Sequence, residues 1–270
     1  MMGTFADCAR IAHALMQPHL PPGSLPQDQL IAQGFCRVDA KQLAALADVP
    51  AGALPPLARY WSELPPDRYL RDGGRYRYRR HACFVQTIAS AARGADAGAA
   101  LQPVAHRPHW QSTAYNALHG GIERWFEPVD PALLAEPAWQ ALVGALGTLF
   151  ARIANAPRWH IEAHQFRIDA SEGVGRPTPE GAHRDGVDFV AVVLVRRRDV
   201  KGGETRVFEA DGEQGVRFEM REPWSALLLD DARVIHETTP IQPDGPQPHR
   251  DTLVLTYRQA GFQSAPSAAR

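Results

Sequence analysis

The chain has 270 residues, of which 44% are hydrophobic and 22% are charged, so it is long enough for one large domain with a sizeable core. Its 29 Lys and Arg residues are balanced by 30 Asp and Glu residues, which leaves a net charge of -1. This balance gives no electrostatic reason to expect a nucleic-acid or acidic-membrane partner.

The cysteines and the hydropathy pattern indicate the compartment. Cys8, Cys36 and Cys83 are too scattered for a disulfide framework or a zinc finger, and they are typical of thiols in a reducing environment. The first residues lack the basic-then-apolar order of a signal peptide, and no apolar run approaches the roughly 18 residues of a membrane span. We therefore predict a cytoplasmic protein without a nucleic-acid or membrane partner.

The first hundred residues combine helical patterning with loops. Helical spacing covers Ala6–Met16 and Asp39–Leu46, where Asp39 is a plausible N-cap. The basic stretch Arg71–Arg80 is interpreted as an exposed strand or loop, and the Ala/Gly-rich stretch Gly94–Pro103 as a mobile loop. Residues 81–90 and 120–129 can extend the sheets predicted further along the chain.

A longer helix is predicted over Asp130–Ala154. Asp130 can cap this helix, and Pro137 is expected to break or restart it. Apolar residues then recur at helical spacing, at Leu142, Leu146, Leu149, Phe150 and Ile153. This stripe indicates a helix face that packs on a sheet.

After Pro157 the pattern becomes that of β-strands. Short alternating or apolar runs such as "DFVAVVLV" and "DTLVLTYR" are separated by Gly- and Pro-containing turns, with no helices between them. This arrangement favours an antiparallel sandwich or barrel. We predict a mainly β fold with flanking helices, as a single domain over 1–270. Residues 1–154 would supply helices and additional strands, and residues 155–262 the barrel-like core with the functional site.

A possible metal site comes from two distant segments. His183 and Asp185 precede the apolar run Phe189–Val195, and on a strand two residues at this spacing share one face. His236 lies at the polar end of a second strand-like run. Two histidines and one carboxylate are typical of non-haem Fe(II) oxygenases, although zinc in a hydrolase would accept the same ligands.

An arginine further along favours the oxygenase. Arg250 opens the last predicted strand, and a guanidinium is suited to bind the distant carboxylate of a keto-acid cosubstrate through two N–H groups. A zinc hydrolase has no such requirement. Arg258, at the far end of the same strand, is the alternative for this role.

Together these segments resemble a known superfamily. "PEGAHRDGVDFVAVVLVRRRDVKGGETRVFE", "LLLDDARVIHETTPI" and "HRDTLVLTYR" resemble the Fe(II)/2-oxoglutarate-dependent dioxygenases over Trp159–Arg258, and "QSTAYNALHGGIERWF" more faintly. The resemblance is strongest to the bacterial branch with free L-amino-acid hydroxylases, such as the L-isoleucine 4-hydroxylases, and biofilm- or stress-associated relatives.

The resemblance implies both a fold and a set of cofactors. The fold would be a double-stranded β-helix, or jelly roll, with Fe(II) held by His183, Asp185 and His236. Arg250 would bind the 5-carboxylate of 2-oxoglutarate, and O2 would be the second cosubstrate. The implied reaction is hydroxylation of an unactivated C–H bond of a small molecule, most simply a free L-amino acid.

The substrate pocket matches the family less closely. Gln165 and Arg167, on the strand "AHQFRI", are expected near the cleft. An amino-acid substrate would need a cation for its carboxylate and an acid for its ammonium group, and Arg124, Glu123 and Arg167 are candidates. A homodimer is possible.

Other readings remain open on the sequence alone. The protein could be a non-catalytic or sensory metal-binding jelly roll, or a zinc-dependent hydrolase on a cupin-like fold. His160 and His164 share a strand face and could hold a second metal. His106, His109 and His119 lie among turn residues and are expected to be solvated. Asp230 and Asp231 are expected only to end a strand.

Overall fold

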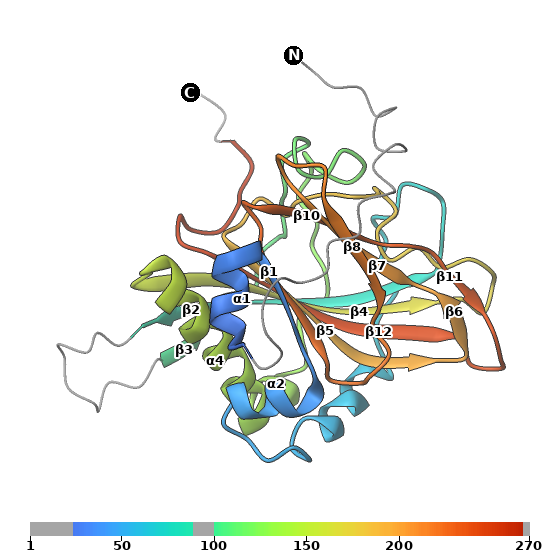
Figure 1. Cartoon of the computed structure of the whole chain (residues 1–270). Helices are drawn as coiled ribbons and strands as arrows, with labels where there is room; N and C mark the ends of the chain where they lie inside the picture. The colour runs from blue at the N-terminus through green and yellow to red at the C-terminus, as the bar shows by residue number, and fades with distance from the viewer. Residues whose placement is uncertain (1–23, 89–99, 267–270) are drawn as a thin grey trace.

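A computed structural model describes residues 24–88 and 100–266 (Figure 1). Its helices are α1 (Pro26–Gln33), α2 (Ala40–Leu46), the 3-10 helix η1 (Pro55–Trp61), α3 (Pro131–Leu134) and α4 (Pro137–Ala154). Its strands are β1 (Phe35–Val38), β2 (Arg77–Thr87), β3 (Ala100–Pro103), β4 (Arg158–Asp169), β5 (Phe189–Arg198), β6 (Val200–Gly202), β7 (Glu204–Glu209), β8 (Gly215–Glu219), β9 (Ala226–Asp230), β10 (Val234–Thr238), β11 (Ile241–Pro243) and β12 (His249–Arg258).

The strands form antiparallel sheets of a double-stranded β-helix. The large sheet has the order β1-β9-β5-β12-β4-β2-β3, and the small sheet the order β10-β7-β8, while β11 pairs with β6. The predicted mainly β jelly roll with flanking helices is therefore confirmed. Strands that precede α4 (β1, β2 and β3) share the large sheet with strands that follow it, so both halves of the chain build one sheet.

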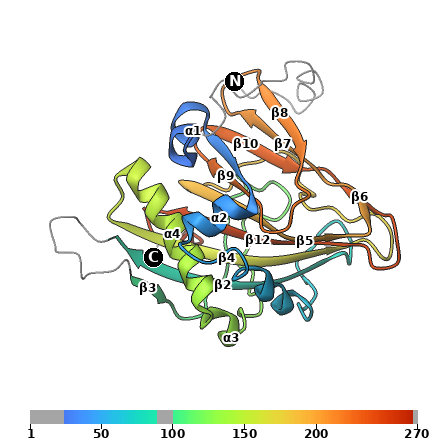
Figure 2. The same ribbon diagram turned by 60° about the horizontal axis from the view of Figure 1, so that its bottom comes forward.

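The large sheet is covered on both faces. In β5, Phe189, Ala191 and Val193 belong to the core against the helices, whereas Val190 and Leu194 belong to the core shared with the small sheet. Figure 2 shows α2 and α4 on one side of β4, β5 and β12, and β7, β8 and β10 on the other. Because successive side chains of a strand point to opposite faces, one run of apolar residues fills both cores.

Helix α4 is fixed to the sheet by aromatic residues. The Trp159 indole N–H donates to the carbonyl of Gly147 at 2.8 Å, and the Tyr257 hydroxyl donates to the carbonyl of Val143 at 2.9 Å. Phe150 stacks on Phe189 with ring centroids 4.6 Å apart. These contacts satisfy the polar atoms of large aromatic side chains inside an apolar layer, and they hold the back of the sheet that carries the site.

The helix signals in the sequence are confirmed where the structure describes them. Asp39 caps α2 in a capping box with Gln42. Asp130 accepts a hydrogen bond from the backbone N–H of Ala132 at the start of α3, and α4 restarts at Pro137. The helix predicted over Ala6–Met16 lies outside the described residues.

Two loop predictions need correction. Within Arg71–Arg80, Arg77 and Arg79 are buried, because they lie on the face of β2 that points into the barrel. Within Gly94–Pro103, the described residues from Ala100 form strand β3, which pairs with β2.

Cys36 and Cys83 are buried free thiols, while Cys8 lies outside the described ranges. None of the described helices combines the length and the apolar character needed to cross a bilayer.

Candidate functional site

His183 and Asp185 lie in the loop before β5. The sequence predicted that strand alternation would bring them together, but this loop is not part of a strand ladder. His183 instead forms an isolated antiparallel bridge with His236 of β10, in which the His183 N–H donates to the His236 carbonyl at 3.0 Å and the His236 N–H donates back at 2.9 Å. The bridge places the two imidazole rings 4.7 Å apart, and a turn at Gly186, with a φ of 76°, follows Asp185.

These three side chains converge. Each offers one ligand atom, and the ligand atoms of His183, Asp185 and His236 all lie within 4.8 Å of one another. The His236 Nε2 atom is 3.9 Å from Asp185 Oδ2. Two imidazoles and one carboxylate on one side of an ion fit ferrous iron with further coordination positions open to a cosubstrate.

Neighbouring groups orient these side chains. The Nδ1 atom of His183 donates to the carbonyl of Gly181 at 3.0 Å, so Nε2 is the nitrogen that can bind a metal. The Gln111 amide donates to Asp185 Oδ1 at 3.2 Å, which leaves Oδ2 on the side of His236. These contacts determine which nitrogen of His183 and which oxygen of Asp185 are available to a cation.

Asp231 holds the loop that carries Asp185. Its buried carboxylate accepts hydrogen bonds from the backbone N–H groups of Asp185, Gly186 and Val187, at 3.0, 2.8 and 3.1 Å. Burial and the nearby Asp185 charge raise the pKa of Asp231 to about 6, against the lowering effect of these hydrogen bonds. The sequence indicated only a strand end here, because no local pattern reports a carboxylate that caps a distant loop.

Burial acts against charge at the donor set itself. Burial raises the pKa of the Asp185 carboxyl, although the His183 charge opposes the rise. Burial and the neighbouring His183 lower the pKa of His236 well below its usual range. A carboxylate and a neutral imidazole in this low-dielectric setting are both stabilised by a bound cation.

The three residues open into a cavity of about 110 Å³ between the sheets. Arg250 of β12 lines this cavity and is only 3% exposed. Its Nε and Nη2 atoms are buried and have no hydrogen-bond partner in the described part of the chain. Burial lowers the pKa of Arg250 to about 10, so the group remains a cation at neutral pH. A buried cation with free donors fits a carboxylate ligand.

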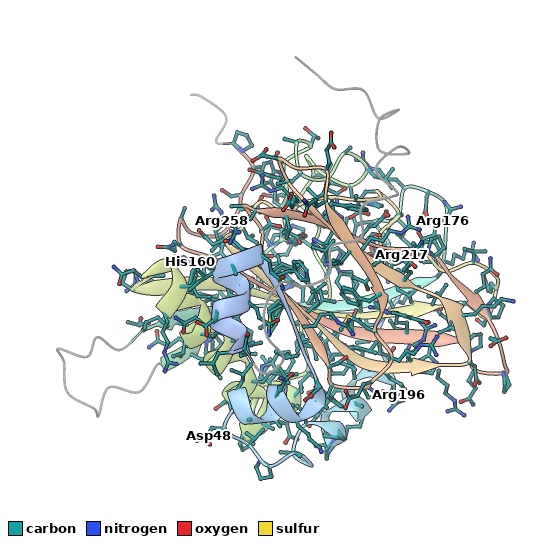
Figure 3. All side chains as sticks on the ribbon, viewed as in Figure 1. Asp48, His160, Arg176, Arg196, Arg217 and Arg258 are labelled. Atoms are coloured by element: carbon teal, nitrogen blue, oxygen red, sulfur yellow. The ribbon has the colours of Figure 1, made fainter. Side chains whose placement is uncertain are left out.

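Arg258 has a different setting. Its guanidinium donates to the carbonyls of Ala260 and Gly261, at 3.2 and 2.8 Å, and it is not part of the cavity wall. Figure 3 shows Arg258 beside His160, whose Nδ1 atom lies 3.3 Å from the Arg258 carbonyl. Of the two arginines of β12 that the sequence left open, only Arg250 shares the cavity with the His/Asp/His group.

Of the other predicted substrate residues, only some line the cavity. Arg124 is buried and lines the cavity, whereas Glu123 is exposed. Gln165 and Arg167 are not part of the cavity wall: the Gln165 amide donates to the carbonyl of Tyr60, and Arg167 pairs with Asp251 at 2.7 Å. Both have odd residue numbers in β4 and therefore lie on the opposite face from the even-numbered His164 and Phe166, which do line the cavity.

A second cluster of histidines borders the cavity, because His109 and His164 are part of the cavity wall. The Glu162 Oε2 atom lies 2.8 Å from His81 Nε2 and 2.6 Å from His109 Nδ1, and His164 Nε2 is 3.8 Å away. The ligand atoms of these four buried residues lie within 4.8 Å of one another, close enough to raise the question of a second metal.

The hydrogen-bond directions argue against His164 as a metal ligand in this cluster. The Arg79 guanidinium, which can only donate, lies 2.7 Å from His164 Nδ1, so that nitrogen accepts and Nε2 carries the proton. A metal on Nε2 would move the proton to Nδ1, where it would face the Arg79 donor. The predicted partner His160 does not join the group. His109 and His119, expected to be solvated, are buried; His106 is exposed.

Fold and site together define a class: a double-stranded β-helix whose cavity contains a His/Asp/His group is the architecture of Fe(II)/2-oxoglutarate-dependent dioxygenases. The family model described as "2OG-Fe dioxygenase" matches residues 58–256, most of the chain. The chain therefore belongs to the 2OG-Fe dioxygenase family. It is an Fe(II)/2-oxoglutarate-dependent dioxygenase that uses O2 and acts on a small-molecule substrate.

Solved structures agree with this assignment. A bsmA homolog from Methylobium petroleophilum PM1 is 55% identical, with a TM-score of 0.83 over 89% of this chain and 94% of that one. IDO from Bacillus thuringiensis shares the fold at 16% identity, with a TM-score of 0.63 over 87% of this chain and 93% of that one. The Fe(II)/(alpha)ketoglutarate-dependent dioxygenase TqaL shares the fold at 18% identity, with a TM-score of 0.62 over 86% of this chain and 85% of that one. No functionally curated protein matches the sequence significantly.

Proposed function

We propose that this enzyme hydroxylates an unactivated C–H bond of a free L-amino acid. In this proposal His183, Asp185 and His236 are the iron ligands, and Arg250 binds the 5-carboxylate of 2-oxoglutarate. The observation that carries the proposal is the presence, in one small cavity, of the converging ligand atoms and of a buried guanidinium with free N–H groups.

Each residue has a defined task in this reaction. When bound, ferrous iron with 2-oxoglutarate and O2 supplies an oxidant that hydroxylates a C–H bond while 2-oxoglutarate becomes succinate and CO2. His183 and His236 present neutral imidazole nitrogens, and Asp185 presents the oxygen that Gln111 does not occupy. The Arg250 donors orient the cosubstrate by a bidentate contact with its far carboxylate. The apolar side chains of Val192 and Val254 in the cavity wall help to exclude water.

The amino-acid substrate is supported by the cavity and by the family branch that the sequence resembles. The cavity wall carries Arg124 as a further buried cation besides Arg250. A free amino acid offers a carboxylate to such a group. The cytoplasmic location and the homodimer stay predictions from the sequence.

Succinate release tests the proposal. The purified protein would be incubated with Fe(II), ascorbate and 2-oxoglutarate, with each of the twenty L-amino acids in turn. We expect one amino acid or a few related ones to raise succinate well above the background without substrate, with a product heavier by one oxygen atom. If none of the twenty raises succinate while iron is bound, the substrate is not a free proteinogenic amino acid.

A further inference from the structure

The cations of the cavity wall differ in what they already bind. Among the described residues, the arginines that line the cavity are Arg77, Arg79, Arg124 and Arg250. Arg77 pairs with Asp67 at 2.7 Å. Arg79 lies 3.9 Å from the same carboxylate, bonds to His164, and is held between aromatic rings of Phe126 and Phe166. Arg250 is reserved for 2-oxoglutarate in the proposed function.

Arg124 is the cation that remains. Its Nη2 donates to Gln111 Oε1 at 2.9 Å, and its Nε atom is buried without a hydrogen-bond partner in the described ranges. Within those same ranges, no carboxylate lies in ion-pair distance of this guanidinium. A buried guanidinium that has no ion-pair partner and an unpaired N–H group is stabilised by an anionic ligand.

The carboxylates near the cavity also differ in whether they already have a partner in the protein. Asp67 is used by Arg77, Glu162 by the imidazoles of His81 and His109, and Asp185 is a proposed iron ligand. Glu180, in the loop before His183, also lines the cavity. Its Oε2 atom is buried and, in the described part of the chain, has no hydrogen-bond partner.

Glu180 Oε1 has only weak contacts. It accepts a long hydrogen bond of 3.4 Å from the Asn116 amide and lies 3.9 Å from His183 Nε2, the nitrogen proposed to bind iron. With iron on that nitrogen, His183 cannot be a cationic partner for Glu180. The buried Oε2 atom, which has no hydrogen-bond donor among the described residues, then favours a ligand group that donates to it, such as an ammonium group.

A chain of amides connects the two free charges. Gln111 Oε1 accepts from Arg124 and also from the Asn116 amide at 3.3 Å, and Asn116 donates to Glu180. The other end of Gln111 donates to Asp185. The unpaired cation, the unpaired anion and the proposed iron ligand are therefore held by one hydrogen-bond network, which orders them relative to each other.

We propose that Arg124 and Glu180 recognise the two charges of a zwitterionic substrate, Arg124 the α-carboxylate and Glu180 the α-ammonium group. This inference rests on the proposed function and deepens it. One unmatched positive and one unmatched negative group in the same small, low-dielectric cavity are complementary to a ligand that carries both charges and no net charge. A simple carboxylic acid or a simple amine would leave one of the two buried charges unpaired.

The test compares an amino acid with analogues that each lack one charge. With the best amino acid from the panel, its des-amino carboxylic acid and its carboxamide, binding would be measured by calorimetry under nitrogen, on protein loaded with Fe(II) and 2-oxoglutarate. Glu180→Gln should weaken amino-acid binding about 10- to 100-fold and abolish the preference over the des-amino acid. Arg124→Met should weaken it similarly and abolish the preference over the carboxamide.

Controls and outcomes separate this inference from the proposed function. Glu123→Gln and Arg217→Met change exposed charges (Arg217 is labelled in Figure 3) and should leave both preferences as in the wild type. Iron stoichiometry and 2-oxoglutarate affinity should be unchanged in all variants. Wild-type preferences in Glu180→Gln and Arg124→Met, with amino-acid turnover intact, would overturn the inference alone. Loss of iron from Glu180→Gln would also overturn it. Absence of turnover or binding with every amino acid would instead reject the proposed function.

Discussion

The backbone N–H of Asp185 donates a 3.0 Å hydrogen bond to the carboxylate of Asp231, which lies 46 residues further along the chain. Asp231 also accepts from the N–H groups of Gly186 and Val187, so one carboxylate determines the course of the loop that presents Asp185. This buried side chain follows β9 and does not line the cavity. It acts on the site through the position of Asp185.

Asp231→Asn should therefore weaken iron binding. The amide nitrogen of Asn cannot accept, so at least one backbone N–H would face another donor and the loop would shift. We expect a loss of about 1–3 kcal/mol of folding stability and about a 10- to 100-fold weaker Fe(II) affinity. Urea unfolding and Fe(II) titration measure the two effects. Asp230→Asn is the control, because Asp230 is a partly exposed neighbour that bonds only to the local Ala232 N–H at 3.2 Å in the described structure. Equal iron affinity in both variants would contradict this role.

Asp185→Ala should remove most of the iron affinity and with it the turnover of 2-oxoglutarate, because the only carboxylate of the proposed ligand set is lost. Metal content after dialysis against a fixed Fe(II) concentration measures the effect. Asp188→Ala, three residues further along the same loop, removes a carboxylate that accepts from the Gln259 N–H at 2.8 Å and should retain one iron per chain. An Asp185→Ala protein with full iron occupancy and activity would exclude this residue from the ligands.

Arg250→Met should retain iron but require much more 2-oxoglutarate. The substitution keeps an unbranched side chain in the cavity wall and removes the charge-assisted hydrogen bonds to the 5-carboxylate, which are worth about 1.5–3 kcal/mol, or about 10- to 150-fold in affinity. The KM for 2-oxoglutarate, measured by succinate release, reports the change. Arg258→Met, at the other end of β12, serves as the matched control and should keep the wild-type KM. A raised KM in the control and not in Arg250→Met would move the role to Arg258.

Stability should fall on acidification because of the histidine cluster. Burial lowers the pKa of His109 to about 4, against the charge of Glu162, which acts in the opposite direction. The unfolded chain, with a His pKa near 6.5, therefore binds more protons than the folded chain as the pH falls from about 6.5 to 4, and stability is lost over this range. At pH 5 this residue should account for about 2 kcal/mol of the loss relative to pH 7.5.

A variant isolates this contribution. His109→Gln can still donate to Glu162 but does not titrate, so its free energy of unfolding should fall less between pH 7.5 and pH 5 than that of the wild type. His106→Gln replaces an exposed ring and should follow the wild type. Urea unfolding at the two pH values measures the difference. An unchanged pH dependence in His109→Gln would show that His109 is not a buried neutral base.

Local patterns in the sequence were sufficient for many of the helices and strands and for the residue types of the central set. Asp39 and Asp130 marked helix starts, Pro137 marked the restart of α4, and period-two runs after Pro157 marked the strands. These features depend on residues a few positions apart, so they can be recognised without the fold. The convergence of His183 with His236 was proposed from the residue types on two distant segments and then supported by the resemblance. Its physical basis, an isolated bridge between a loop and β10, was not visible in the spacing.

The tertiary structure alone decided which face of each strand points into the cavity. The large sheet is buried on both faces, so the sequence of its strands does not tell which face lines the cavity. Arg77 and Arg79 point into the cavity, whereas Gln165 and Arg167 lie on the opposite face of the sheet. It also decided the partners of Asp231 and Glu180, because these depend on how loops distant in sequence meet across the barrel. Residue types and short-range spacing specify the chemistry that is available, whereas the register of paired strands and the course of the loops determine which charges meet and which remain free for a ligand.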